Sequence, residues 1–265
     1  ETSTSREKTI PVGFILPAAR SAASLSLSAT QTHKPSIASF SDIARPMPRA
    51  PPVTIAVLWN SDIIELSFYC YSFDETKECI IIDPGCYDER ENTILKNFIE
   101  QNNLKPVALV NTHCHLDHIF GNNFVADTYN LIPIMHKADL PMLEYATIAA
   151  INYGVNLNKL SKTSNFIEEG DIVKFGNSKF NILFTPGHAP GHICLVNNEE
   201  NIIISADVLF HLSIGRTDLP MSNHETLLNS IKDKLLILDD KMVVYPGHGP
   251  STTIGYERQN NPFLQ

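Results

Sequence analysis

Residues 107–122 read VALVNTHCHLDHIFGN. The apolar first part of this segment is typical of a buried strand. The part that follows places three histidines and an aspartate within six positions, although the whole chain of 265 residues has only ten histidines. These four side chains are His113, His115, Asp117 and His118. Because imidazole and carboxylate groups bind zinc, iron and manganese in proteins, the segment predicts a metal site directly after the strand.

Three other apolar runs end in the same residue types. The runs FNILF, NIIIS and MVVYP are each followed within a few residues by a histidine or an aspartate, and these are His188, Asp207 and His248. A lone histidine at a strand end is usually a surface or hydrogen-bonded residue, so the prediction rests on the whole set. If the four strands point in the same direction, their ends collect these side chains at one edge of the fold.

The number of ligands indicates how many ions they would hold. Seven exceed the three or four that one zinc ion takes, and they fit two divalent ions that share a bridging carboxylate. No set of thiolates selects zinc, so we expect zinc with iron or manganese as alternatives. Alternate residues of an extended segment face the same way, so His113 and His115 are expected to point together and Cys114 elsewhere. Asp117 and His118 follow where a helix could begin and would face the second ion.

Several neighbouring residues compete for these roles. His192 lies four residues after His188, but it begins the next apolar run instead of ending one, so we prefer His188 as the ligand. Asp83, in an Asp-Pro-Gly turn, either hydrogen-bonds a ligand histidine or only forms the turn. Glycines at 187 and 247 are expected to let the backbone turn sharply before His188 and His248.

Composition bounds the remaining possibilities. Apolar residues make up 43% of the chain and charged residues 18%, as in globular proteins, and no apolar run is long enough to span a membrane. The net charge is −9, with +3 in residues 1–50 and −12 in the remainder, which disfavours broad contact with nucleic acid. Five cysteines with no C-x-x-C pair favour a reducing, cytoplasmic location over a disulfide framework.

The first 52 residues differ from the rest. They hold seven of the 17 prolines and nine serines and show no sustained strand or helix period. We expect a disordered tail over 1–52, with an N-terminal targeting segment as the alternative, and a single folded domain over 53–265.

The domain alternates apolar runs with helical-period segments. This pattern predicts an α/β fold with helices covering sheet faces. Helices are expected over 91–102 and around Leu227–Leu235, the second capped by Ser222 or Asn223. A hairpin is expected around Gly176-Asn177. Strands are expected over 78–82, 106–111, 131–136, 192–197, 201–206 and 241–246.

The motifs H-x-H-x-D-H, TPGH, SADVLF and YPGHGP, together with GRTD, resemble those of the metallo-β-lactamase superfamily. The match is closest to the hydroxyacylglutathione hydrolase, or glyoxalase II, group and covers roughly residues 66–265. The resemblance implies an αββα four-layer sandwich with metals at one edge of two facing sheets. It also implies a division of ligands between the ions: His113, His115 and His188 for the first, Asp117, His118 and His248 for the second, and Asp207 bridging them.

That resemblance implies a thioesterase. The expected reaction is hydrolysis of S-2-hydroxyacylglutathione by a metal-bridging hydroxide, with Asp117 orienting the nucleophile. The chain continues for seventeen residues after His248, so we expect the single-domain subgroup, which lacks the helical domain that contacts glutathione. Arg216, Tyr256 and Arg258 are candidate substrate contacts, although Arg216 could equally form a structural salt bridge.

Other functions remain open at this point. One is a mononuclear iron persulfide dioxygenase that uses His113, His188 and Asp207. Another is a lactonase or β-lactamase-type hydrolase of the same superfamily. A binding module that keeps a structural metal is disfavoured, because structural sites rarely need seven ligands. The expected partner is a small thioester, with neither nucleic acid nor membrane.

Overall fold

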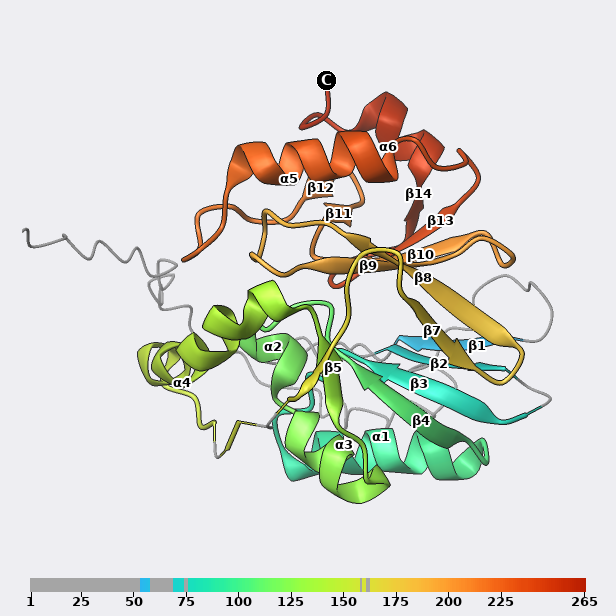
Figure 1. The fold of residues 1–265 in the computed structure, drawn as a ribbon, viewed down its shortest axis with the longest axis vertical. Coiled ribbons are helices and arrows are strands. Elements are labelled where there is room, and N and C mark those ends of the chain that lie inside the picture. Colours follow the sequence, from blue (N-terminus) through green and yellow to red (C-terminus); the bar gives the residue numbers. More distant parts are fainter. Residues whose placement is uncertain (1–52, 58–68, 74–75, 158, 161–162) are drawn as a thin grey trace, which may run out of the picture. The chain divides into compact units, whose positions relative to one another are not determined.

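The structure, a computed structural model, describes residues 53–57, 69–73, 76–157, 159–160 and 163–265 (Figure 1). The tail expected over 1–52 lies outside these ranges. Within them, every helix is too short or too polar to traverse a lipid bilayer.

Two mixed sheets form the centre of the described domain. The first has the strand order β1-β2-β3-β4-β5-β6, antiparallel from β1 to β3 and parallel from β3 to β6. Its strands are Val53–Val57, Tyr69–Phe73, Glu78–Ile82, Lys105–Val110, Pro133–Met135 and Asn165–Phe166. Each strand expected in this half of the chain is present, although β5 is shorter than the apolar run that predicts it.

The second sheet has the order β14-β13-β10-β9-β8-β7. Its strands are, in chain order, Ile172–Phe175, Ser178–Phe184, Ile193–Asn197, Ile202–Ala206, Val243–Pro246 and Thr252–Thr253. The strands β10 and β13 are parallel, whereas β8 and β10 are both antiparallel to β9. Consequently β8, β10 and β13 all point in one direction, as the ligand pattern requires. The hairpin expected around Gly176-Asn177 joins β7 to β8.

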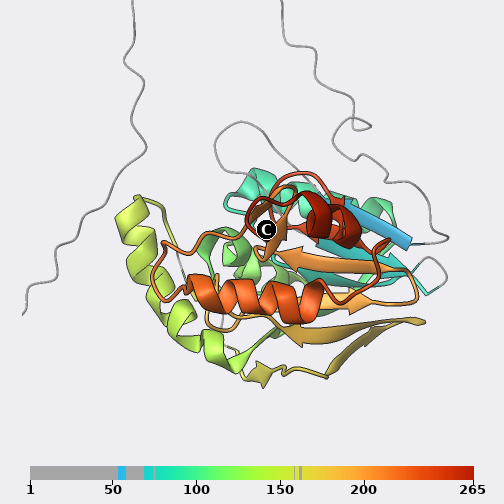
Figure 2. The same cartoon turned by 90° about the horizontal axis from the view of Figure 1, so that it is seen from above.

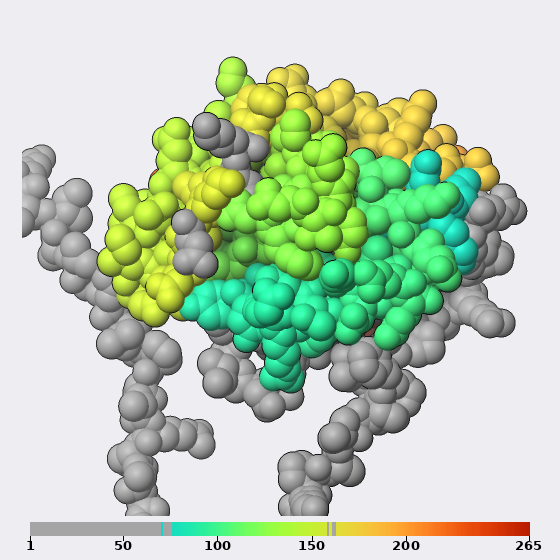
Figure 3. Space-filling view, turned by 90° about the horizontal axis from the view of Figure 1, so that it is seen from below, coloured from blue at the N-terminus to red at the C-terminus, as the bar shows by residue number. Residues whose placement is uncertain are grey.

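Helices cover the outer face of each sheet (Figures 1 and 2). The helices α1 and α3 lie outside the first sheet, and Figure 3 shows their side of the molecule as a continuous surface. The helices α5 and α6 lie outside the second sheet, while α2 and α4 lie near the ends of the strands. The bounds are Glu89–Gln101 (α1), Leu116–Ile119 (α2), Asn122–Tyr129 (α3), Leu140–Tyr153 (α4), His224–Ser230 (α5) and Ile254–Asn260 (α6). The αββα architecture implied by the resemblance is therefore confirmed.

Strand periodicity explains how the first sheet packs on both sides. Ile80 and Ile82 of β3 face the second sheet and belong to the core between the two sheets. Cys79 and Ile81, which alternate with them, belong to the cluster under α1 with Leu95. A strand that is buried on both faces is expected to be a continuous apolar run, and the sequence of β3 after its first residue is such a run.

Helix caps set two of the predicted boundaries. The helix expected over 91–102 begins at Glu89, because the Asp88 side chain accepts a hydrogen bond from the Glu91 amide. The helix α5 is capped by Asn223, one of the two expected residues, whose side chain accepts from the Thr226 amide at 2.9 Å. After Ser230 the same segment continues as a π-helical turn over Ile231–Leu235.

The helix α4 was not among the expected elements. It buries Met142 and Ala146, yet Ile148, Ile151 and Tyr153 of the same helix are exposed. With apolar residues on every side, the sequence shows no polar face and hence no clear helical period. The helix ends at Gly154, which has the left-handed φ of 68° that glycine tolerates.

Gly187 offers a test of how the ligand loop is fixed to α5. It has φ 137°, and a Cβ there would overlap the Leu227 backbone of α5. We expect Gly187→Ala to lower the free energy of unfolding in urea by about 3 kcal/mol or more, because strain and overpacking add. The matched control is Gly170→Ala, which also has a positive φ (88°) but open space around it. Gly170→Ala should lower the free energy of unfolding by only about 1–2 kcal/mol. Equal losses of stability in the two variants would contradict the close approach of Gly187 to Leu227.

Candidate metal centre

The seven predicted ligands meet at one edge of the two sheets. His113 to His118 follow β4, His188 follows β8, Asp207 follows β10, and His248 follows β13. Since β8, β10 and β13 point the same way, the residues after them converge on the segment after β4.

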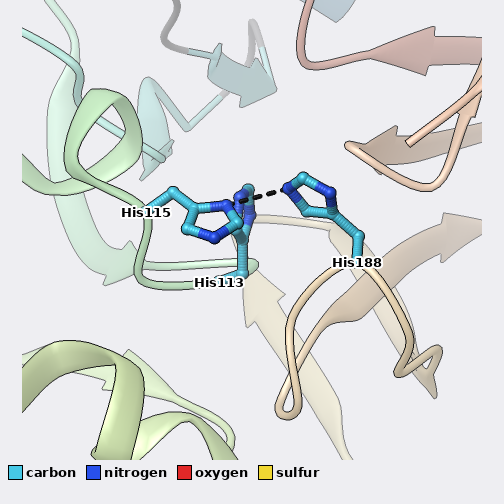
Figure 4. A group of neighbouring side chains, drawn as sticks. All are labelled: His113, His115 and His188. Carbon is cyan, nitrogen blue, oxygen red and sulfur yellow. Dashed lines mark hydrogen bonds between the residues drawn. The ribbon is translucent and has the colours of Figure 1, made fainter. Parts of the chain in front are cut away.

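The first group consists of His113, His115 and His188, whose ring nitrogens lie within 4.8 Å of one another. Figure 4 shows the three rings converging from two different loops. The His115 Nδ1 atom is 2.8 Å from His188 Nε2. Two imidazole nitrogens at this distance, with a third ring beside them, match the ligand set of one ion.

The second group consists of Asp117, His118 and His248. The Asp117 Oδ2 atom lies 3.1 Å from His248 Nε2 and 3.5 Å from His118 Nε2. Asp207 lies between the two groups, because its carboxylate is 3.4 Å from His188 Nε2 and 3.5 Å from His118 Nε2. This is the position that a carboxylate bridging two ions must occupy.

The ring nitrogens that face away from the centre are held by other groups. His118 Nδ1 lies 3.0 Å from Asp83 Oδ2, and His188 Nδ1 lies 2.8 Å from the Arg216 carbonyl oxygen. Such contacts leave Nε2 of each ring directed at the centre. Asp83 also accepts a hydrogen bond from the Thr112 amide at 2.7 Å. Asp83 therefore takes the hydrogen-bonding alternative, and its atoms also lie near His113 and His118.

Asp139 is a residue of this centre that the sequence analysis missed. It is fully buried and accepts hydrogen bonds from the Cys114 amide at 2.5 Å and the Gly191 amide at 2.8 Å. It thus connects the ligand loop after β4 to the loop that carries His188. Burial raises the pKa of Asp139 to about 6, although the two backbone amides act in the opposite direction. No local pattern marks Asp139, since it lies in a short turn before an unpredicted helix.

His192 lies behind the ligands instead of among them. Its ring is fully buried, stacks on the His113 ring at 4.7 Å, and lies 3.3 Å through Nε2 from the Asp207 amide. Two further histidines of the described residues lie elsewhere: His136 stacks on Phe184, and His211 stacks on Tyr256.

Gly247 was expected to permit a sharp turn of the backbone, but its lack of a side chain matters for a different reason. The sharp turn expected at Gly187 is present, but Gly247 is not among the glycines with positive φ. A Cβ at Gly247 would instead collide with Asp207 Oδ1 and crowd His118. The missing side chain therefore makes room for the central carboxylate.

The electrostatics of the centre favour bound cations. Burial lowers the pKa of His113, and the surrounding histidines lower it further. Burial also acts to lower the pKa of His118, but the carboxylates of Asp117, Asp207 and Asp83 outweigh it and raise that pKa. Three buried side-chain atoms of the centre form no hydrogen bond within the described residues, namely His113 Nε2, His118 Nε2 and Asp207 Oδ1. Unpaired buried polar atoms of this kind are costly, and a divalent metal ion would bind all three, so the residues present fit a divalent metal site.

A cavity of about 560 Å³ opens beside the centre. Arg216 lines it, as expected of a substrate contact, but its guanidinium is paired with Asp218. Tyr256 and Arg258, the other two candidate substrate contacts, are not among the residues that line this cavity. Arg258 instead binds the Leu236 and Leu238 carbonyl oxygens and Asp240, an arrangement that holds the C-terminal helix in place.

Comparison with known proteins agrees with this geometry. The sequence profile of the metallo-β-lactamase superfamily matches residues 67–248. The chain belongs to this superfamily. Its members are metal-dependent hydrolases that bind divalent ions through clusters of histidine and aspartate, as the present clusters would.

Similar proteins include both a curated relative and solved structures. The chain is 38% identical to hydroxyacylglutathione hydrolase GloC of Haemophilus influenzae, over 72% of this chain and 90% of that one. The fold is similar to that of TTHA1623 in a di-iron-bound form, with a TM-score of 0.68 and 35% identity over 78% of this chain and 100% of that one. It is also similar to the BLEG-1 B3 metallo-β-lactamase, with a TM-score of 0.68 and 30% identity over 81% and 100% of the two chains.

Removing the carboxylate behind His118 should weaken metal binding. We expect Asp83→Ala to lower metal affinity about 10–100-fold, since His118 loses the group that orients its ring. Competition with a chromophoric chelator measures the change. Asp127→Ala is the matched control, because Asp127 is exposed on α3, and it should bind metal normally. Equal affinity of the Asp83 variant and the native protein would contradict the role given to Asp83.

Metal binding should also release protons. The pKa of His118 is raised in the metal-free protein, so the ring is protonated below that pKa and must lose its proton to bind a metal. Affinity should therefore fall as the pH is lowered through neutrality. Calorimetric titrations at about pH 6.5 in buffers of different ionisation enthalpy should report proton release that shrinks at alkaline pH. Heats independent of the buffer would exclude a protonated histidine in the metal-free site.

Proposed function

We propose that this protein is a thioester hydrolase of the hydroxyacylglutathione hydrolase type, which acts on S-2-hydroxyacylglutathione with two divalent ions. The observation that carries the proposal is the pair of three-residue clusters with Asp207 between them, beside a cavity that reaches both. The 38% identity to GloC supports the choice of thioesters within the superfamily.

In this proposal the ligands divide as the clusters do. His113, His115 and His188 would hold one ion and Asp117, His118 and His248 the other, and Asp207 would be shared between them. When bound, such a pair of ions polarises the substrate carbonyl and acidifies a water molecule. Zinc is the first candidate, and iron is the second, since the similar TTHA1623 structure is described as di-iron-bound.

The protein's own groups would perform the remaining tasks. Asp117 lines the cavity, and His118 and His248 hold its pKa at about 2 against the effect of burial. It is therefore ionised near neutral pH and can accept a hydrogen bond from the attacking water. Asp83 and the Arg216 carbonyl oxygen keep the His118 and His188 rings oriented. The leaving thiolate needs no strong general acid, because thiols have a pKa of about 8.5.

β-Lactam hydrolysis is the second candidate. The similarity to a B3 metallo-β-lactamase favours it, since amide hydrolysis would use the same ions and the same cavity. An amine, unlike a thiolate, must be protonated as it leaves.

One preparation can test the proposal. We expect about two divalent ions per chain and hydrolysis of S-lactoylglutathione that a chelator abolishes. His118→Ala and Asp207→Ala should each lower kcat/KM about 100-fold or more, because each removes a ligand. His224→Ala is the matched control, since His224 is exposed and contacts Thr217 outside the ligand set.

The outcomes separate the candidate functions. Full turnover by either ligand variant would contradict the assignment. Turnover of β-lactams alone would favour the second candidate. Oxygen consumption with glutathione persulfide and one iron per chain would favour the dioxygenase.

A further inference from the structure

The cavity beside the metal centre has two chemically different walls. One wall is formed by the ligands themselves. The other, among the described residues, is almost wholly apolar and comes from four parts of the chain: the α2 end, α4, β11 and the segment before α5. Its members are Leu116, Phe120, Met142, Tyr145, Ala146, Ala149, Tyr153, Val155, Phe210, Leu219 and Pro220.

The helix α4 provides the long side of this wall. Met142, Ala146, Ala149 and Tyr153 are spaced three or four residues apart, so they lie along one face of the helix. Met142 and Ala146 are buried, and Ala149 is half-buried. The two alanines in the middle of this face leave the space that a larger side chain would fill.

Charges on the cavity wall are few. Arg216 is the only lysine or arginine among the described residues that line the cavity. Its Nε and Nη2 atoms donate to the two carboxylate oxygens of Asp218 at 2.9 and 2.8 Å, so its charge is already compensated. A ligand carboxylate placed against the apolar wall, away from the metal ligands, would be desolvated without a free cation to bind it, which is unfavourable. An aliphatic chain meets no such cost there.

We infer that this cavity is an acyl subsite, and that it selects thioesters with an unbranched apolar chain, such as hexanoyl or octanoyl, over those with the short hydroxylated lactoyl group. The inference rests on the metal-dependent thioesterase activity of the proposed function, and it replaces the 2-hydroxyacyl group named there with an unbranched apolar acyl group. The glutathione part of the substrate would then lie at the mouth, where Tyr153, Arg216 and Pro220 are exposed. Hydrolysis adds water to the carbonyl carbon and breaks the C–S bond, yielding a carboxylate, a thiol and a proton.

Chain length is the first test. With the metal-loaded full-length protein, kcat/KM is measured for the acetyl, butyryl, hexanoyl, octanoyl and lactoyl thioesters of glutathione. We expect an increase of about fourfold for each added methylene group. A flat series, or a preference for S-lactoylglutathione over the octanoyl thioester, would overturn the inference.

A variant on α4 localises the effect. Ala149→Phe fills the cavity and should lower the octanoyl-to-acetyl ratio of kcat/KM at least about tenfold. Thr147→Phe is the matched control, because Thr147 is exposed on the same helix and does not line the cavity. It should leave the ratio unchanged. Equal ratios in both variants and the native protein would place the acyl chain elsewhere.

Binding provides a readout that does not depend on turnover. Calorimetry with the metal-loaded protein should show tighter binding of octanoate than of butyrate, and weaker binding of octanoate to Ala149→Phe. If octanoate binds in this way but no thioester is hydrolysed, the proposed function fails and the acyl subsite stands. If thioesters are hydrolysed without regard to chain length and octanoate binds no better than butyrate, the subsite fails and the proposed function stands.

Discussion

The described structure is organised around side chains that cannot all be satisfied by hydrogen bonds. His113 and His118 are fully buried, yet the Nε2 atom of each forms no hydrogen bond to the described residues, and the same is true of Asp207 Oδ1. Burial of unpaired polar atoms costs free energy, and a cation bound at their centre would offset this cost. Metal binding should therefore contribute to the free energy of unfolding of this fold.

Other residues hold the unsatisfied groups in position. Asp83 binds the segment after β4 and the His118 ring together, and Asp139 connects that segment to the loop carrying His188. Gly247 admits the Asp207 carboxylate because it lacks a side chain. These contacts join loops that follow strands of both sheets, so the geometry of the centre depends on the packing of the two sheets against each other.

Much of the fold and of the ligand set could be predicted from local patterns. The strands β3, β4, β9, β10 and β13 are mostly apolar runs, so they could be predicted from the sequence. Each ligand follows a strand, so the ligands could be predicted from their positions after these runs. The helix α4 could not be predicted because it carries apolar residues on every side and therefore shows no helical period. Most of the apolar wall of the cavity could not be predicted for the same reason. Asp139 acts only through contacts distant in sequence. Tyr256 and Arg258 are candidate substrate contacts from the sequence, whereas in the structure the Arg258 side chain binds the segment from Leu236 to Asp240.

Anomalous diffraction from crystals of the metal-loaded protein would locate the bound ions. We expect two peaks about 3.5–4 Å apart, one beside His113 and His188 and one beside His118 and His248, with the Asp207 carboxylate between them. A single peak, or an absence of peaks with these side chains hydrogen-bonded to one another, would contradict this expectation.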